Sequence, residues 1–371
     1  MASTFKTFVS DDIANTRTLL HESIPITGSI VNGTTYTNNQ GVETNIKTHG
    51  HGMFQSVYDY PYQSSSANHI FDMTVGENDS GVTASTADFY SKQKNIYNQM
   101  AQVLVGHDVN GSIRDFDQDG DLTDGDKHDS VIFFNFARLL GKDEIKKGTF
   151  SMNLGMTEVY ANRLDGVQAL VIADTGAATD YKVNSPAGEY GILRATGTSG
   201  DPLTADDVPC GLIYYQAGIV VISTGLFLET GQNTNGLLKG ATYNAAGPKA
   251  NVGEQDTLAA RFADNSHTMD EISKAVRDRI LNIQFSNTTE LNSTIYFCRV
   301  GHNDFNYSSN PTYLEKSKIR VKNKSTDAPV SYITTVGLYS ADNELLAAAK
   351  LSEPLRKDPT NDMTLRVRLD Y

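Results

Sequence analysis

The stretch GLIYYQAGIVVISTGLFL, residues 211–228, is the longest uncharged apolar run of the chain. Its length reaches the lower limit for a membrane-spanning helix. The run also contains Gln216, three glycines and many β-branched residues and tyrosines, a composition that is typical of buried strands. We therefore predict two buried strands with a bend near Ala217-Gly218, and no membrane span.

The regions around this run are also rich in strand-like segments. Further strands are predicted at residues 131–136, 150–154, 168–173, 191–195, 293–300, 318–322, 331–339, 344–350 and 363–371. In the last of these, apolar residues alternate with Arg366 and Arg368, so that one face is apolar and the other is basic. Strands separated by Gly, Asp and Pro turns indicate antiparallel sheets.

Two segments have convincing helical periodicity. The first covers residues 85–105, with Ser85 and Asp88 resembling a capping box and Gly106 placed to end the helix. The second covers residues 268–280 and begins with the capping box formed by Thr268 and Glu271. Both segments carry one apolar stripe, which predicts helices that pack on a core.

The predicted fold is mainly β (a β-rich α+β protein), with several domains of antiparallel sheets or sandwiches and two principal helices. Residues 1–158 are expected to form a loop-rich β region that includes the first helix and an acidic loop, and short β-type pieces are expected there at residues 29–31 and 70–75. Residues 159–260 are predicted to form a central antiparallel β domain. Residues 261–371 are predicted to form the second helix and a C-terminal antiparallel β domain.

The charge of the chain argues against a nucleic-acid partner. Among 371 residues, 31 are basic and 44 are acidic, which gives a net charge of −13, and such a surface repels phosphate backbones. Cys210 and Cys298 are isolated from each other in the sequence. Because no C-x-x-C spacing is present, we expect no zinc site, and we favour two free thiols over a disulfide.

The sequence contains no signature of a common enzyme class. Phosphate-binding and dinucleotide-binding loops, the G-x-S-x-G elbow and the H-E-x-x-H motif are all missing, so we predict no catalytic residue and no enzymatic activity. His49 and His51 are separated by one residue, so on a strand both side chains would point to the same face, where they could bind a transition metal. No third ligand can be named, and two unrelated surface histidines are the favoured interpretation.

One acidic segment, DFDQDGDLTDGD at residues 115–126, matches a calcium-binding loop. Its candidate ligands occupy positions one, three, five, seven, nine and twelve of the loop: Asp115, Asp117, Asp119, the backbone carbonyl of Asp121, Thr123 and Asp126. Gly120 supplies the sharp turn at position six. Asp126 replaces the usual bidentate Glu, which predicts weak, structural Ca²⁺ binding. The alternative is a solvated acidic turn without an ion.

Several strand-and-turn segments resemble a known group of proteins. They are GMFQSVYDY (52–60), SSANHIF (65–71), FARLL (136–140), KDEI (142–145), FNYSSNPT (305–312), KIRV (318–321), SYITTVGLY (331–339), ELLA (344–347), PL (354–355) and LRVRLDY (365–371). Together they resemble virion structural proteins of large contractile-tailed phages, particularly myoviruses of marine cyanobacteria. The resemblance covers most of the chain but contains no chemical signature.

The resemblance implies a structural component of a bacteriophage virion, assembled in the host cytoplasm and placed in the contractile tail or baseplate, where fibres attach. The expected partners are other virion proteins and further copies of the chain, with no nucleic acid and no membrane. Three alternatives stay open: a calcium-dependent receptor- or carbohydrate-binding module on the particle, a neck- or capsid-associated structural protein, and a particle-borne polysaccharide hydrolase.

Overall fold

The computed structural model describes residues 5–38, 42–78, 88–122, 125, 127–141, 143–155, 169–197, 208–227, 242–244, 255–257, 268–308, 313–315, 318–319, 324 and 326–370. Strands hold 47% and helices 15% of the described residues, which confirms the predicted mainly β class. No helix in these ranges is long and apolar enough to cross a membrane. Both cysteines are free thiols.

The described helices are few and most are short. They are η1 (Ser10–Asp12), α1 (Gly28–Val31), η2 (Thr34–Tyr36), α2 (Asp88–Leu104), α3 (Ala137–Leu140), η4 (Thr224–Leu226) and α5 (Met269–Arg277). The strands are β1 (Ile13–Thr27), β2 (Ile46–Thr48), β3 (Gln55–Tyr58), β4 (His69–Glu77), β5 (Ser130–Asn135), β6 (Glu144–Ile145), β7 (Ser151–Gly155), β8 (Ala169–Ala173), β9 (Tyr190–Gly197), β10 (Val208–Tyr214), β11 (Ile219–Ser223), β12 (Thr242–Asn244), β13 (Gln255–Thr257), β14 (Ile280–Val300), β15 (Leu314–Glu315), β16 (Lys318–Ile319), β17 (Ser331–Tyr339), β18 (Leu345–Lys357) and β19 (Met363–Asp370).

The chain forms two compact units. The central unit contains Leu20–Thr289, and the terminal unit combines Met1–Leu19 with Glu290–Tyr371. The strands β1 and β14 belong partly to each unit. The predicted boundaries near residues 158 and 260 lie outside the described residues. The two units differ from the three consecutive regions that the sequence predicts, because β8–β11 form one sheet with strands from the first 155 residues.

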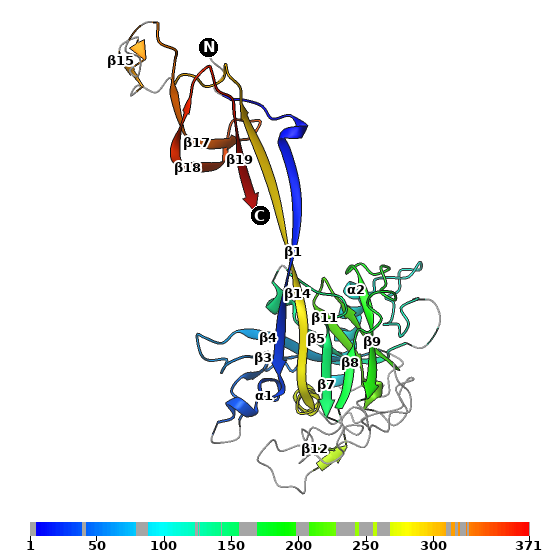
Figure 1. The fold of residues 1–371 in the computed structure, drawn as a ribbon. Coiled ribbons are helices and arrows are strands. Elements are labelled where there is room, and N and C mark those ends of the chain that lie inside the picture. Colours follow the sequence, from blue (N-terminus) through cyan, green and yellow to red (C-terminus); the bar gives the residue numbers. More distant parts are fainter. Residues whose placement is uncertain are drawn as a thin grey trace. The chain divides into compact units, whose positions relative to one another are not determined.

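A large antiparallel sheet organises the central unit (Figure 1). Its strand order is β7-β8-β9-β10-β11-β5-β4-β3-β2, and the first part of β14 pairs with β7. The apolar run at residues 211–227 forms the β10–β11 hairpin at the middle of this sheet, in the register Tyr214↔Ile219. The bend lies at Gly218, whose φ is +65°. The prediction of two buried strands with a bend at this point is therefore confirmed.

The hydrophobic core of the central unit lies between the sheet and its helices. Phe133 on β5 is fully buried, as are Phe116, Phe134 and Tyr97. The helix α2 packs on β4 at Gly76, where a Cβ atom would lie 3.0 Å from Cα of Tyr97. The glycine thus lets the helix come close enough to seal this part of the core.

The two predicted principal helices are present. The helix α2 is followed at Gly106 by a left-handed residue with φ +88°, as predicted, whereas its predicted start at Ser85 lies outside the described residues. The helix α5 begins with the predicted capping box of Thr268 and Glu271. The helix ends at Arg277 rather than at the predicted residue 280, because residue 280 is the first residue of β14.

A buried ion-pair network joins α5 to the residues around α1. The Arg277 side chain is 1% exposed, donates to the carbonyl oxygen of Val31 at 2.9 Å and lies 3.1 Å from the carboxylate of Glu43. Lys274 contacts the second oxygen of that carboxylate. Burial would raise the pKa of Glu43, but the charges of Arg277 and Lys274 outweigh it and lower the pKa below its ordinary value.

A second buried carboxylate has the opposite behaviour. Asp174 follows β8, is 2% exposed, and accepts hydrogen bonds from the Gly148 N–H at 2.7 Å and the Tyr215 hydroxyl at 3.3 Å. Burial raises the pKa of Asp174 to about 6. The folded state therefore disfavours the ionised carboxylate at neutral pH.

Asp174→Asn is expected to stabilise the chain at about pH 8 by about 1–3 kcal/mol, because the amide oxygen keeps the hydrogen bonds from Gly148 and Tyr215 and carries no charge. The folded pKa lies above the ordinary value of 3.8. The stability that Asp174 contributes is therefore complete below pH 3.8 and is lost as pH rises through about 6. Urea unfolding at about pH 4 and pH 8 checks this, and an equal effect at both pH values would contradict it.

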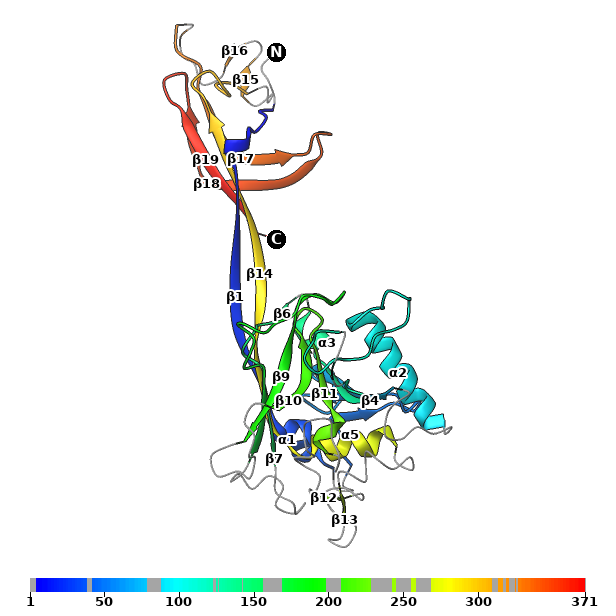
Figure 2. The same ribbon diagram turned by 90° about the vertical axis from the view of Figure 1, so that its right-hand side faces the viewer.

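The terminal unit is built from hairpins and long strands (Figure 2). The C-terminal part of β14 pairs with β19 from Ser293↔Asp370 to Val300↔Met363. The strands β17 and β18 form a separate two-stranded antiparallel sheet, as do β15 and β16. In the described part of this unit, the buried apolar side chains are Ile295, Val300 and Leu338, and none belongs to the contiguous core of the protein.

Candidate functional site

The acidic loop that follows α2 is fixed at both ends by the core. Phe116 is fully buried, and its ring lies 5.2 Å from that of Tyr97. The Tyr97 hydroxyl accepts from the Phe116 N–H at 3.0 Å and donates to the carbonyl oxygen of His128 at 2.9 Å. The two ends of the loop are thereby held together, and Asp117 and Lys127 form an isolated antiparallel bridge between them.

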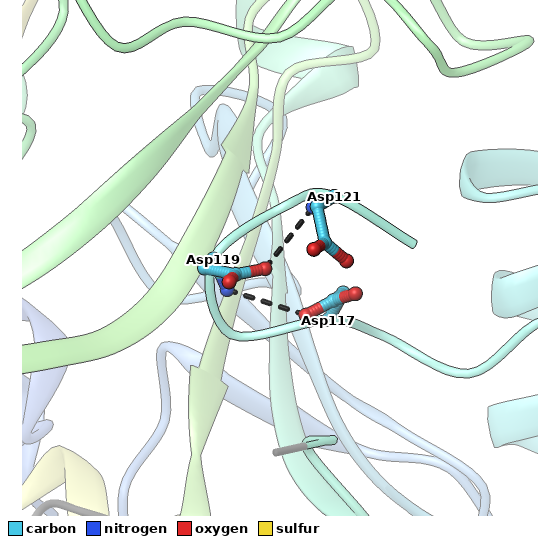
Figure 3. A group of neighbouring side chains, drawn as sticks. All are labelled: Asp117, Asp119 and Asp121. Carbon is cyan, nitrogen blue, oxygen red and sulfur yellow. Dashed lines mark hydrogen bonds between the residues drawn. The ribbon is translucent and has the colours of Figure 1, made fainter. Parts of the chain in front are cut away.

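Three of the predicted ligands come together in this loop (Figure 3). Carboxylate oxygens of Asp117, Asp119 and Asp121 all lie within 4.8 Å of one another. The Asp119 N–H donates to Asp117 Oδ1 at 3.3 Å, and the Asp121 N–H donates to Asp119 Oδ1 at 3.1 Å. Asp121 thus contributes its carboxylate to the group, whereas the loop pattern assigns its backbone carbonyl.

Gly120 makes the turn that the loop pattern predicts. Its φ is +75°, and a Cβ atom there would lie 2.8 Å from Cγ of Lys182. Its carbonyl oxygen accepts from Asn184 Nδ2 at 3.0 Å and from the Tyr190 hydroxyl at 3.2 Å. The turn is therefore held by neighbouring side chains as well as by its own carboxylates.

The other predicted ligands do not join this group in the described residues. Asp115 is exposed, and its carboxylate interacts with the side chains of Asn78 and Tyr97. Thr123 and Asp126 lie outside the described residues. The described group therefore offers three carboxylates, fewer than the six to eight oxygens that surround calcium.

A lysine already neutralises part of the acidic group. Lys127 Nζ lies 2.6 Å from Asp117 Oδ2, and the Leu122 N–H donates to the same oxygen at 2.7 Å. The Asp117 side chain is 1% exposed, so its negative charge needs this compensation. The three carboxylates and Lys127 leave two net negative charges, which suits a divalent cation.

Sequence patterns missed a hydrogen-bonded chain on β3 and β4. The Ser56 hydroxyl donates to Asp72 Oδ1 at 2.5 Å, while Nε2 of His49 lies 3.1 Å from the same hydroxyl and Nε2 of His69 lies 2.7 Å from Asp72 Oδ1. The residues come from three separate segments, and no local spacing joins them. Ser56 and Asp72 meet because they are paired in the register of β3 and β4. A prediction of that register is the signal that could have found them.

This chain of side chains does not have the order of a catalytic triad. A serine nucleophile transfers its proton to histidine, whereas the Ser56 proton points to Asp72. Burial of Asp72 would raise its pKa, but hydrogen bonds from His69 and Ser56 lower it, and a carboxylate with a lowered pKa is a poor base. Ser56 is also 2% exposed. The chain therefore fits a structural role between neighbouring strands.

The terminal unit carries an unusual number of exposed large apolar side chains. We call them the exposed apolar set: Phe5, Val9, Ile13, Leu19, Phe305, Tyr307, Tyr332, Tyr339, Leu345, Leu346 and Leu355. These 11 residues compare with three buried apolar residues in the described part of the same unit. Burial of apolar surface is the main term that stabilises a fold, so this unit has little stabilisation of its own.

No family model matches the chain, and neither a curated protein nor a solved structure matches it.

Proposed function

We propose that the chain is a structural component of a tailed-phage virion, in the tail or baseplate, and that neighbouring chains cover its terminal unit. The observation that carries this proposal is the difference in burial between the two units. The central unit encloses a contiguous core, whereas the terminal unit leaves its exposed apolar set in solvent. With eleven exposed against three buried apolar residues, the terminal unit gains most of its apolar burial only when other chains cover it.

Two further observations support assembly rather than catalysis. The sequence segments that resemble contractile-phage structural proteins include β17 and parts of β18, in the terminal unit. In addition, the hydroxyl–histidine–carboxylate contacts at Ser56 lack the order that nucleophilic catalysis needs. The terminal unit is therefore the part of the chain that distinguishes assembly from the other candidate functions. Its proposed partners are other virion proteins and further copies of the chain.

The proposal is tested by following the chain through particle assembly. Particles of the phage that carries the gene are purified through a density gradient and analysed by quantitative mass spectrometry. We expect several copies of the chain per particle, which remain bound after a wash with high salt because the contacts are apolar. Recovery of the chain only in the soluble fraction of the lysate would contradict the proposal.

We also propose that the acidic loop binds one structural Ca²⁺ ion. The convergence of the Asp117, Asp119 and Asp121 carboxylates supports this, and Thr123 and Asp126 are the further ligands that the loop pattern predicts. Weak affinity is expected, because an ion has to compete with Lys127 for Asp117 and because an Asp stands at the twelfth position. The role proposed for the ion is to fix the link between α2 and β5.

Calcium is expected to raise the melting temperature of the chain by about 2–3 °C. A dissociation constant of about 10⁻³ M and about 10 mM Ca²⁺ give about 1.4 kcal/mol of stabilisation. Asp119→Asn keeps the acceptor for the Asp121 N–H and removes one ligand charge, so it should abolish most of this shift. Thermal melts with calcium and with a chelator check both statements.

Asp108→Asn is the matched control for the calcium experiment. Asp108 Oδ1 likewise accepts backbone N–H groups, from Asn110 and Ser112, both at 2.8 Å, but Asp108 lies outside the acidic group. This variant should keep the full calcium shift. Equal melting temperatures of the wild type with calcium and with chelator would show that the loop is only a solvated acidic turn.

A further inference from the structure

The first half of β18 has a charge pattern that is complementary to itself. With Glu344, which directly precedes the strand, the segment reads Glu344-Leu-Leu-Ala-Ala-Ala-Lys350, with an acid at one end, a base at the other and five apolar residues between them. Leu345 is 56% and Leu346 is 69% exposed. Glu344 and Lys350 are exposed as well, and neither side chain forms an ion pair with another described residue.

The same segment lies on an open edge of a sheet. The β17–β18 hairpin is a two-stranded sheet, so the outer edge of β18 pairs with no other strand in the described part of the chain. A two-stranded sheet is only marginally stable by itself. Open edges with apolar side chains are the sites at which another strand adds through main-chain hydrogen bonds.

Charge selects both the partner and its orientation. In an antiparallel arrangement with a second copy of β18, centred on Ala347, Glu344 of each copy faces Lys350 of the other. A parallel arrangement would instead oppose like charges, which is destabilising. The segment thus matches itself in one orientation, as a two-fold contact requires.

The charges of the two units agree with a contact of this kind. The terminal unit holds 13 basic and 12 acidic residues, whereas the central unit holds 18 basic and 32 acidic residues. Two central units would therefore repel each other, whereas two terminal units carry almost no net charge. Contact between copies is electrostatically permitted at the terminal unit.

We propose that β18 of one copy pairs antiparallel with β18 of a second copy, with the two-fold axis at Ala347. The contact joins the two hairpins edge to edge and places Leu345 and Leu346 beside Ala349 and Ala348 of the second copy. Leu346 is the extra residue where the β17–β18 register shifts, so the contact is assigned to the apolar segment and its flanking charges rather than to an unbroken ladder. This inference rests on the proposed function, since it names one neighbour that covers the terminal unit.

The test is a charge exchange in the full chain, followed by sedimentation equilibrium. The wild type should self-associate reversibly, beyond the 40.5 kDa mass of one chain. Lys350→Glu places two pairs of carboxylates in opposition and should weaken self-association by about 10- to 100-fold, and Glu344→Lys should do the same with opposed lysines. The double variant E344K/K350E rebuilds both ion pairs and should return the dissociation constant to within about threefold of the wild-type value.

Arg366→Glu is the matched control for the single variants. Arg366 is an exposed arginine on β19 of the same unit, outside the proposed contact, and its substitution should leave self-association unchanged. All the variants should melt within about 2 °C of the wild type, because the altered side chains are exposed.

Two results would overturn this inference. One is a wild type that stays monomeric up to about 100 µM; the other is a double variant that associates as weakly as the single variants. The proposed function has a separate readout, which is recovery of the chain in purified particles. If the chain is present in particles but the double variant does not restore self-association, the proposed function stands and only this contact is wrong.

Discussion

Phe133→Ala is expected to lower the free energy of unfolding of the central unit by about 3–5 kcal/mol. Phe133 lies on β5 between β4 and β11 and is fully buried. Its ring is 5.5 Å from that of Phe116, and a Cβ atom on Gly76 would lie 2.9 Å from its Cε2 atom. Truncation therefore leaves a cavity where the sheet, the helix and the acidic loop meet. Denaturant unfolding followed by circular dichroism measures the loss.

The matched control is Phe305→Ala in the terminal unit. Phe305 is 40% exposed, and its loss should cost less than about 1 kcal/mol in dilute chain. The contrast between the two phenylalanines measures the difference in packing around the two side chains. Similar losses for both variants would show that the terminal unit has a core of its own.

Removal of the Glu43 charge is the second substitution that is expected to lower the free energy of unfolding strongly. Glu43→Gln leaves Arg277, which is 1% exposed, without a carboxylate and should destabilise the central unit by about 3–5 kcal/mol at neutral pH. Because the folded pKa of Glu43 lies below the ordinary 4.5, its stabilisation is present above pH 4.5 and is lost as pH falls through the folded value. The difference between wild type and variant should therefore shrink in acid, which urea unfolding over a pH series checks.

Glu290→Gln serves as the control for this ion pair. Glu290 pairs with Arg17, but these side chains are 39% and 60% exposed, and exposed pairs contribute about 0–1 kcal/mol. The double variant Glu43→Gln with Arg277→Met should recover part of the lost stability, because no buried charge is then left unpaired. A loss at Glu43 that is as small as the loss at Glu290, or that is independent of pH, would rule out the buried pair as a stabilising element.

The parts of the fold that the sequence predicts are those with a buried face and a local signal. The β10–β11 hairpin is readable because almost all of its residues are buried, which makes an unbroken apolar run. The helix α5 is readable because Thr268 and Glu271 form its capping box within four residues. Gly106 marks the end of α2 for a similarly local reason, its positive φ.

The parts that escape prediction have no such signal. The strand β1 is 15 residues long but is exposed on both faces over most of its length, so its sequence shows no alternation of apolar and polar residues. The first part of β14 is also missed, although Ile280, Ile283 and Phe285 in it are buried. Residues 29–31 are β-forming by composition, and the prediction of a strand there is wrong. They lie in α1, which the backbone of β14 crosses so closely that a Cβ on Gly28 would lie 2.2 Å from the Ile280 oxygen.

The candidate site likewise has parts that the sequence predicts and parts that it does not. The spacing of Asp117, Asp119 and Gly120 predicts the turn, because those contacts are local. The turn of Asp115 toward Tyr97 depends on how α2 packs, and Lys127 enters from the returning end of the loop. Contacts between distant segments, such as Arg277 with Glu43 across 234 residues, have no counterpart in a local pattern.

A density map of the assembled phage particle, with this chain placed in it, tests the central claim most directly. The account predicts several copies per particle, with the exposed apolar set of the terminal unit covered by other chains. A map in which the chain is present but its terminal unit projects into solvent with that set uncovered would contradict the account.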